Sequence, residues 1–486
     1  MRIKFLALCA TAFVATGLYS QNKQLLYDFY EIPQSLMVNP GVNAQEKWHV
    51  GVPVLSGLSF QAATSGVTVN DLFANDGIDF NVKVRERVLD ALSRRDDFSS
   101  TSQIEGFSIG FRGRNRPDDY YSFGMYGEMD FIVYWPKDLA ILAFEGNGGA
   151  NIGRGFDLGH LNVRGEMVNV FHFGINRKMN ESLTLGVRAK LYSSIFNFKS
   201  TNNSGTFRTV PGEDNLLANT ITADMQLQTA GVEGFIDIVE EDTDTTRKDL
   251  ERLFAQRVLL GGNLGLGFDA GFTYKLNPQT TITGSVLDVG FIYNSKDVKN
   301  YTVRGNASNE GINIFLPEDI DDLGVDLWQD LVDEIEASVP LEDNDNGYIS
   351  FRPIKVYGSI RYDFGQGGGT TFSKECGCAI NVVERSSSEY YRNSIGGQLF
   401  LQKRPLGIQP ALTAFYQKRL GQSFSVKTTY TVDKYSFSNV GLGINVQAGP
   451  INFYILGDNL LGYQNVADSH YASFQFGINI LSWNDN

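Results

Sequence analysis

The stretch YASFQFGINIL, residues 471–481, decides the fold class of this chain. Along it, apolar and polar residues alternate one by one, with Phe474, Phe476, Ile478 and Ile480 set against Ser473, Gln475, Gly477 and Asn479. A period of two puts successive side chains on opposite faces of a β-strand. The segment therefore predicts a strand with one apolar and one polar face near the end of the chain.

The same alternation recurs throughout the sequence. It is clearest in residues 121–131, 183–191, 264–276, 424–432 and 440–447. Counting the weaker runs as well, we expect about fourteen to sixteen strands, many of them about ten residues long or longer. Short turn-forming segments separate several pairs of runs, at residues 115–119, 176–182, 276–280 and 448–450. This spacing is typical of antiparallel hairpins.

Strand length distinguishes a membrane barrel from a soluble sandwich. The polar faces carry charged residues such as Glu128, Asp130, Arg188 and Lys427, and such a face would meet water in either fold. Strands of soluble proteins average about five or six residues, whereas tilted strands of about ten residues match the apolar core of a bilayer. A closed barrel is also the sheet that leaves no unpaired edge in lipid.

We therefore predict an all-β chain that forms a transmembrane antiparallel β-barrel of about 14 strands. Its last strand is expected to pair with its first. The apolar face of residues 471–481 would then meet lipid and the polar face the lumen.

The first 20 residues have the pattern of a secretory signal peptide. Arg2 and Lys4 precede an apolar run at residues 5–18, and Ser20 precedes the expected cleavage site. No later run reaches the roughly 18 apolar residues of a membrane-spanning helix. The formal net charge of −14 makes nucleic acid an unsuitable partner. We expect an exported protein.

Long inserts interrupt the strand pattern. They are expected at residues 79–100, 199–219, 231–259, 295–350 and 364–392. Apolar residues recur at helical spacing within three of them, which predicts helices in residues 79–96, 246–259 and 318–339.

The insert at residues 317–345 contains twelve acidic residues and no Lys or Arg. It is either a solvated helix packed on the barrel rim or a surface that attracts a cation or a partner. We take Trp328 in this insert, together with Asp458 and Asn459 near the end of the chain, as candidate rim or partner contacts. For Asp458 and Asn459 the alternative is a hydrogen bond that fixes the barrel.

The sequence predicts no catalytic residue and no enzyme. GFSIG, residues 106–110, fits the G-x-S-x-G pattern of a nucleophilic serine, but that pattern requires a strand–turn–helix elbow. Here it lies within an alternating strand. Ser108 and His172 are both expected to face the lumen, and nothing in the sequence joins them.

We expect no metal and no cofactor. EDNDNG, residues 342–347, resembles the start of a calcium loop, but its twelfth position is Pro353 rather than a glutamate. The four histidines occur singly, so no zinc site follows. Cys376 and Cys378 are interpreted either as two free thiols or as a strained, labile disulfide.

Whether a residue falls at an odd or an even position of its strand assigns it to one of the two faces. On this basis the candidate lumen-facing residues are Ser108, His172, Arg188, Lys190, Asp288 and Lys427. Asp288 shares its predicted face with Val286 and Gly290, opposite Leu287. It is interpreted either as a hydrogen-bonding group that fixes the barrel or as a ligand or partner contact.

Three motifs carry a family resemblance: SLMVNPG (residues 35–41), SVLDVGFI (residues 285–292) and ILGDNLLG (residues 455–462). With them the chain resembles the superfamily of long-chain fatty-acid transporter (FadL-like, PorV-type) barrels. More narrowly, it looks like an uncharacterised family of outer-membrane proteins of the Bacteroidota. The resemblance spans nearly the whole chain after the signal peptide.

The resemblance implies about fourteen strands in residues 47–486 and an N-terminal segment, residues 21–46, folded into the lumen as a hatch. Leu36, Met37, Asn39 and Pro40 would belong to that hatch. Some relatives move hydrophobic molecules, and others are accessory barrels of secretion and gliding machinery.

Three hypotheses about function follow. The first is a non-enzymatic accessory or binding component of a surface or secretion complex in the outer membrane of a Gram-negative bacterium, with a protein partner and with outer-membrane lipid around it. The second is FadL-like passage of a hydrophobic small molecule. The third is an aqueous porin.

Overall fold

The computed structural model describes residues 23–212, 217–241, 246–310, 341–366, 391–421 and 423–483. Several expectations concern residues outside these ranges. They are the signal peptide, the helix at residues 318–339 with Trp328, and the pair Cys376 and Cys378.

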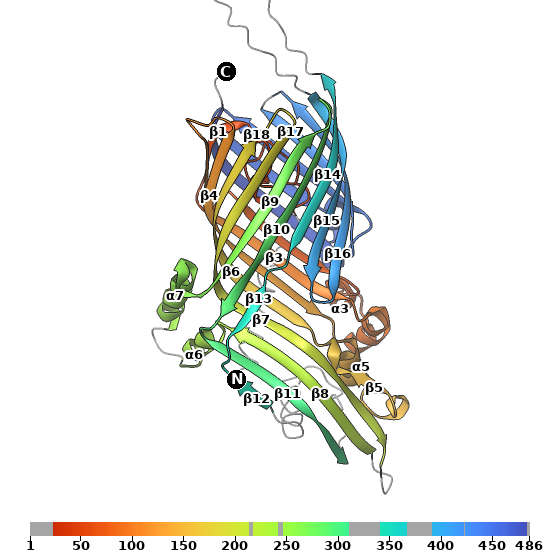
Figure 1. Cartoon of the computed structure of the whole chain (residues 1–486). Coiled ribbons are helices and arrows are strands. Elements are labelled where there is room, and N and C mark those ends of the chain that lie inside the picture. Colours follow the sequence, from red (N-terminus) through yellow and green to blue (C-terminus); the bar gives the residue numbers. More distant parts are fainter. Residues whose placement is uncertain are drawn as a thin grey trace, which may run out of the picture.

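The described strands form one antiparallel sheet that closes on itself (Figure 1). Around the ring lie β1 (Glu46–Gly51), β2 (Leu58–Thr64), β3 (Asp97–Arg112), β4 (Asp119–Tyr134), β6 (Val163–Lys178), β7 (Leu183–Pro211), β9 (Asn263–Lys275), β10 (Thr280–Asn294), β13 (Tyr348–Phe351), β14 (Lys355–Gln366), β15 (Tyr391–Arg404), β16 (Gly407–Leu420), β17 (Phe424–Val432), β18 (Asn439–Ala448), β19 (Ile451–Asp458) and β20 (Tyr471–Trp483). If β1 with β2, and β13 with β14, are each counted as one interrupted strand, the ring is a closed 14-strand barrel, as predicted.

The last strand closes the barrel. β20 pairs with β19 on one side and with β1 and β2 on the other, and these two short strands also pair with β3. Ser473, Gln475 and Asn479 are buried inside the ring, whereas Ile480 is exposed on its outer face. The alternation of residues 471–481 therefore separates lumen from exterior, as the sequence indicates.

The barrel is apolar outside and polar inside. Val187, Leu266 and Phe268 are 54%, 59% and 53% exposed on the outer face. Arg188, Lys190 and Asp269 are buried in the lumen. This is the reverse of a soluble protein and the arrangement expected of a barrel surrounded by lipid.

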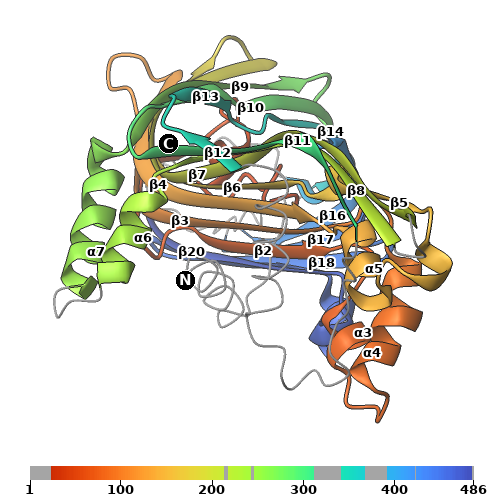
Figure 2. The same ribbon diagram turned by 90° about the horizontal axis from the view of Figure 1, so that it is seen from below.

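The two ends of the barrel differ. Short turns join β3 to β4, β6 to β7, β9 to β10, β16 to β17 and β18 to β19 at the end where β1 begins and β20 finishes. The helical inserts lie at the opposite end (Figures 1 and 2). The helices are α3 (Val69–Phe73), α4 (Phe80–Lys83), η1 (Val84–Leu89), α5 (Lys137–Glu145), α6 (Glu233–Glu241), α7 (Thr246–Gln256) and η5 (Arg257–Gly261). In the described ranges none of the helices combines the length and apolar character needed to cross a membrane.

One group of inserts forms a small core of its own beside the barrel rim. Val84, Val88, Leu89, Leu142 and Phe156 are buried together where η1, α5 and the short strand β5 (Gly155–Asp157) meet. The helix predicted in residues 79–96 is present as α4 and η1, and the one predicted in residues 246–259 is present as α7 and η5.

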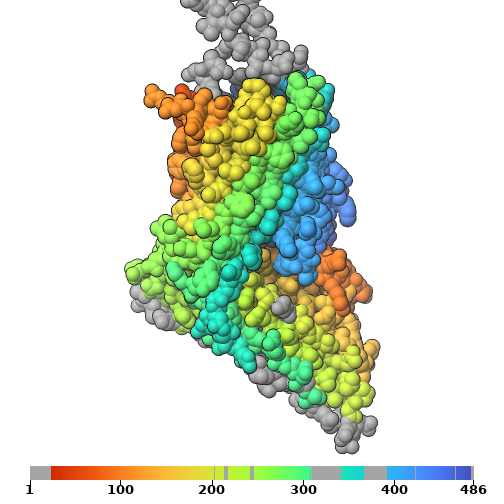
Figure 3. Space-filling model, viewed as in Figure 1, coloured from red at the N-terminus to blue at the C-terminus, as the bar shows by residue number. Residues whose placement is uncertain are grey.

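Two predicted loops are in fact strands. β7 continues through residues 199–211, and the segment expected as a loop at 295–350 contains β11 (Val298–Glu310) and β12 (Leu341–Asn344). With β8 (Leu217–Ala230), these strands extend the sheet beyond the barrel (Figure 3). The prediction was wrong because residues 199–211 and 298–310 are mostly polar at both odd and even positions, so these stretches lack the apolar alternation used to find the other strands.

Candidate functional site

The lumen is occupied by the N-terminal part of the described chain. Residues 23–44, called the luminal segment below, run in tight turns with one short helix, α2 (Ser35–Val38). Leu25, Leu26, Tyr27 and Ile32 are fully buried against the inside of the barrel. Leu36, Met37, Asn39 and Pro40, which the resemblance assigns to a hatch, all lie in this segment.

Polar side chains of the wall hold the backbone of the luminal segment. Arg188 of β7 donates to the carbonyl oxygens of Leu36 (2.9 Å) and Met37 (2.7 Å). Lys427 of β17 donates to the carbonyl oxygen of Tyr27. Further donors are Gln398 to Tyr27 O (3.1 Å), Ser285 to Val38 O (2.6 Å) and Asn176 to Pro40 O (2.8 Å). These bonds satisfy carbonyl groups that would otherwise be buried without partners.

The Asn-Pro-Gly sequence at residues 39–41 lies flat on the wall. Asn39 donates from its side chain to the carbonyl oxygen of Phe272 (3.2 Å) and accepts from the backbone N–H of Gly41 (2.9 Å). The wall here consists of Gly186 and Gly271, which pair across β7 and β9. A Cβ on Gly271 would lie 2.2 Å from the Asn39 side-chain oxygen, so the close approach requires glycine.

A second face of the luminal segment is apolar. Leu25, Leu26, Tyr27, Phe29, Ile32 and Val38 form one cluster with the wall residues Leu287, Tyr357, Phe400, Ala411, Tyr454 and Leu456. Tyr27 stacks on Tyr357 with ring centroids 4.8 Å apart, and Tyr357 contacts Phe400 at 4.7 Å. The wall beneath the segment is therefore apolar on one side and hydrogen-bonding on the other.

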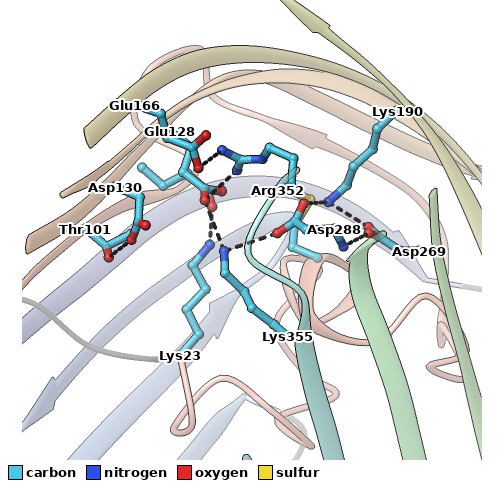
Figure 4. A network of polar contacts seen from close by, with 12 residues as sticks. Lys23, Thr101, Glu128, Asp130, Glu166, Lys190, Asp269, Asp288, Arg352 and Lys355 are labelled. Atoms are coloured by element: carbon cyan, nitrogen blue, oxygen red, sulfur yellow. Dashed lines mark hydrogen bonds and ion pairs between the residues drawn. The ribbon is translucent and has the colours of Figure 1, made fainter. Parts of the chain in front are cut away.

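Next to the luminal segment the lumen carries a network of ion pairs (Figure 4). Glu128 accepts from Arg352 (2.9 Å) and Lys355 (3.0 Å). Lys355 also pairs with Asp288 (3.1 Å), and Lys190 pairs with Asp288 (2.6 Å) and Asp269 (2.9 Å). Every charge of this group has an opposite charge within contact distance, as burial requires.

Lys23, at the start of the luminal segment, points toward Glu128 in this network (Figure 4). It donates to the side chain of Gln103. Burial lowers the pKa of the Lys23 ammonium to about 8, and the Glu128 carboxylate opposes that shift. A cavity of about 50 Å³ lies here, lined by Lys23, Glu128, Lys190, Asp288, Lys355 and their neighbours.

Asp288 faces the lumen, at the point where the alternation of β10 changes phase. The pairing of β10 with β9 shifts between Val286 and Val289, and Asp288 has a positive φ of 59°. Val286 is consequently exposed on the outside, and Leu287 and Asp288 both point inward. The predicted faces of Val286 and Leu287 were therefore wrong, because a β-bulge inserts one extra residue.

Ser108 and His172 both lie in the lumen but do not form a pair. The hydroxyl of Ser108 lies 3.3 Å from Nε2 of His49, and Nδ1 of His49 lies 2.6 Å from the hydroxyl of Tyr120. Tyr120 donates in turn to Glu46 (3.1 Å). In the described chain neither ring nitrogen of His172 has a hydrogen-bond partner. The sequence missed His49, because only the closing of β1 on β3 brings it to Ser108.

Asp458 and Asn459 are buried. Asp458 accepts from Thr429 (3.2 Å), and its backbone N–H donates to Ser473 (3.1 Å). Asn459 adopts a positive φ of 52° and donates to Ser469 (2.8 Å). These contacts favour the interpretation that both residues fix the barrel over the one that they meet a partner.

Arg352 and Lys355 are central to the network and were not among the predicted site residues. They flank Pro353 at the interruption between β13 and β14. The available signal was the stretch ISFRPIKVY, residues 349–357, in which two cations sit within an otherwise apolar run. Among the described residues, no group of three or more His, Cys, Asp or Glu side chains is arranged to hold a metal ion.

Comparison with solved structures finds transporters and a transporter homologue. The toluene transporter TbuX of Ralstonia pickettii has 10% identity, a TM-score of 0.37 and 93% coverage of both chains. A FadL homologue of Pseudomonas aeruginosa has 9% identity, a TM-score of 0.37 and coverage of 92% of this chain and 91% of its own. The toluene transporter TodX of P. putida has 9% identity, a TM-score of 0.33 and coverage of 95% and 93%.

At TM-scores this low, the similarities carry no argument about function. No curated protein matches the chain in sequence. A family profile does match, over residues 40–458, and so covers most of the barrel. The chain accordingly belongs to the family of unknown function DUF5723.

Proposed function

We propose that this protein is a gated channel for a hydrophobic or amphipathic small molecule in the outer membrane of a Gram-negative bacterium. The luminal segment, residues 23–44, serves as its hatch. The observation that carries the proposal is the apolar cluster between this segment and the wall. If the segment moves, Leu287, Tyr357, Phe400 and Leu456 become the lining of a path through the barrel. An apolar lining suits an apolar solute.

The way the segment is held supports a hatch that can move. It contacts the wall through hydrogen bonds from wall side chains to its backbone, through hydrogen bonds between side chains, through the ion pair of Glu31 with Arg419, and through one apolar face. A hydrogen bond contributes about 1 kcal/mol net when water can replace the lost partner. Water that enters the lumen as the segment leaves can therefore replace these hydrogen bonds.

Orientation follows from the unequal ends of the barrel. Outer-membrane barrels have short turns on the periplasmic side and long loops outside. On this basis the turn joining β9 to β10 is periplasmic, and α3, α5 and α7 are external. The luminal segment joins β1 at the periplasmic end.

The test compares uptake by cells whose outer membrane contains the full chain or a variant lacking residues 23–44. One probe is an apolar dye that fluoresces after it crosses the outer membrane, and the other is a sugar of similar size. The full chain is expected to admit the dye and exclude the sugar, whereas the deletion admits both. Equal rates for both probes through the full chain would contradict the proposal.

A second function, as an accessory component of a surface complex, is favoured by a different observation. β7, β8, β11 and β12 extend the sheet well beyond the apolar part of the barrel, with polar strands such as residues 298–310. A channel needs no such extension, whereas a docking platform does. Co-purified proteins that disappear when residues 199–230 and 298–310 are replaced by a short turn would support this role, and unchanged co-purification would count against it.

The filled lumen argues against an open aqueous pore, which ranks last among the candidate functions. The cavity beside the luminal segment measures about 50 Å³, enough for a few waters but not for a sugar. Stable large conductances of the full chain in a planar bilayer would reverse this ranking.

A further inference from the structure

A groove lies outside the barrel, under the helices of one insert. It is bounded by the end of α7, by η5 and by the nearby wall, and it encloses about 670 Å³. Figure 2 shows α6 and α7 outside the ring of strands. The wall side of the groove is formed by Ser194 and Ile195 of β7, by Asn263 at the start of β9, and by Lys296 and Asp297.

The groove lies at the edge of the apolar outer surface. On β9, the exposed apolar side chains run from Leu264 to Tyr274. About ten residues at about 3.3 Å each, tilted by about 40°, span about 25 Å, the height of the lipid-facing band of such barrels. Because the groove begins at Asn263, next to Leu264, it opens at the surface of the bilayer. The groove therefore lies at the end of the barrel that carries the long inserts.

The groove is positively charged in a protein whose net charge is −14. It is lined by three cations, Arg252, Arg257 and Lys296, and by one carboxylate, Asp297. Arg257 already pairs with Asp297 (2.6 Å). Lys296 donates to the carbonyl oxygen of Gly261 (3.0 Å), and in the described chain no ion pair engages Arg252 or Lys296. Two positive charges are thus uncompensated.

Apolar residues line the same groove. Leu253, Leu259 and Leu260 belong to its lining, and Leu259 is 68% exposed. They continue toward Leu264 and the lipid-facing surface of β9. A groove with cations at its mouth and leucines leading into the bilayer complements a molecule with an anionic head and apolar chains.

We propose that this groove binds the phosphorylated headgroup of a lipid of the surrounding outer leaflet. Arg252 and Lys296 contact the phosphate, since guanidinium and ammonium groups donate charge-assisted hydrogen bonds to phosphate oxygens. The acyl chains lie along Leu259, Leu260 and Leu264. The lipid would fix the helical insert against the bilayer, and its site is separate from the proposed channel in the lumen.

The test uses the full chain purified in a mild detergent and native mass spectrometry. The probes are a bis-phosphorylated lipid A, the same lipid without phosphates, and inorganic phosphate. The double variant Arg252→Ala/Lys296→Ala is expected to bind the phosphorylated lipid at least tenfold more weakly. The control, Arg247→Ala/Lys248→Ala, removes equal charge from α7, the helix of Arg252, at positions outside the groove, where Arg247 is 91% exposed and pairs with Glu251. It is expected to bind like the unmodified protein.

Three outcomes would overturn the proposal. They are an equal loss of binding in both variants, equal binding of the lipid without phosphates, and binding of inorganic phosphate alone with the affinity of the lipid. The four replaced side chains lie on the surface, and the shift in gel mobility on heating reports that each barrel is folded. Because the groove is outside the lumen, uptake of the apolar dye stays unchanged in both variants, so this proposal and the channel fail independently.

Discussion

Pro40 of the luminal segment lies directly against Gly186 of β7. A Cβ on Gly186 would stand 1.9 Å from the carbonyl oxygen of Pro40, well inside the contact distance of the two atoms. The barrel thus provides a bare patch of wall where the segment lies flat. The shape of the wall holds the segment in place, as the hydrogen bonds do. A substitution at Gly186 can therefore displace the segment without any change in the segment's own sequence.

Substituting Gly186 by Ala should lift the luminal segment from the wall. The added Cβ meets backbone rather than a flexible side chain, so we expect a cost of about 1–3 kcal/mol. Hydrogen exchange of peptides from residues 23–44 should become at least tenfold faster. Gly397→Ala is the matched control, because its Cβ finds the nearest atom 3.9 Å away. Equal protection from hydrogen exchange in the two variants would show that the contact with Gly186 does not hold the segment.

Arg188 and Lys427 both hold the luminal segment, but we expect different effects on the free energy of unfolding when each is replaced by Met. Arg188 binds two carbonyl oxygens and pairs with Asp269 (2.6 Å). Its loss leaves a buried carboxylate with fewer partners, which should lower the free energy of unfolding by about 3–5 kcal/mol.

Lys427 is fully buried, and the described residues include no ion-pair partner for it. The carbonyl oxygen of Tyr27 keeps Gln398 as a donor when Lys427 is replaced. Lys427→Met should therefore change the free energy of unfolding by less than about 1 kcal/mol or raise it. Urea unfolding in lipid vesicles measures both variants. A loss for Lys427→Met as large as that for Arg188→Met would contradict this account of the two side chains.

Neutralising Glu128 should unbalance the ion network of the lumen. Glu128→Gln leaves Arg352 and Lys355 with fewer counter-charges, and we expect a loss of about 3–5 kcal/mol in the free energy of unfolding. Adding Lys355→Gln restores the balance and should recover about 0.5–3 kcal/mol of that loss. If the double variant is no more stable than Glu128→Gln alone, the two side chains are not coupled.

The two luminal histidines should respond differently to replacement by Phe. His49 joins Ser108 to Tyr120 and Glu46, so His49→Phe leaves these buried groups with fewer partners and should cost about 1–3 kcal/mol. His172 packs against Tyr126 with ring centroids 5.9 Å apart and has no hydrogen-bond partner in the described chain. His172→Phe should preserve the free energy of unfolding. If urea unfolding shows a larger loss of stability for His172→Phe than for His49→Phe, this assignment is refuted.

The sequence predicts the barrel because lipid imposes a strict pattern on it. The clean alternation of residues 471–481 and 183–191 exists because one face meets hydrocarbon and the other a polar lumen. The same alternation identifies Arg188, Lys190 and Lys427 as lumen-facing residues, since in a regular strand residues at odd and even positions lie on opposite faces.

The sequence does not predict what lies outside the bilayer or what long-range closure brings together. The strand at residues 298–310 has mostly polar residues on both faces, so no regular apolar alternation marks it. His49 meets Ser108 only when the barrel closes. The β-bulge at Asp288 reverses the alternation over a few residues, and nothing in the local pattern of apolar residues indicates it.

The most direct test of the hatch is a reversible link between the luminal segment and the wall. Gln34 and Asn479 exchange two hydrogen bonds, of 2.8 and 2.9 Å, between the segment and β20. Replacing both with Cys, together with Cys376→Ser and Cys378→Ser, allows a short thiol-specific cross-linker with a cleavable bond to join them. Uptake of the apolar dye is then measured in the same cells before and after the link is cleaved. The account predicts that the linked barrel blocks the dye and that cleavage restores its uptake. Equal uptake in the linked and cleaved states would contradict a moving hatch.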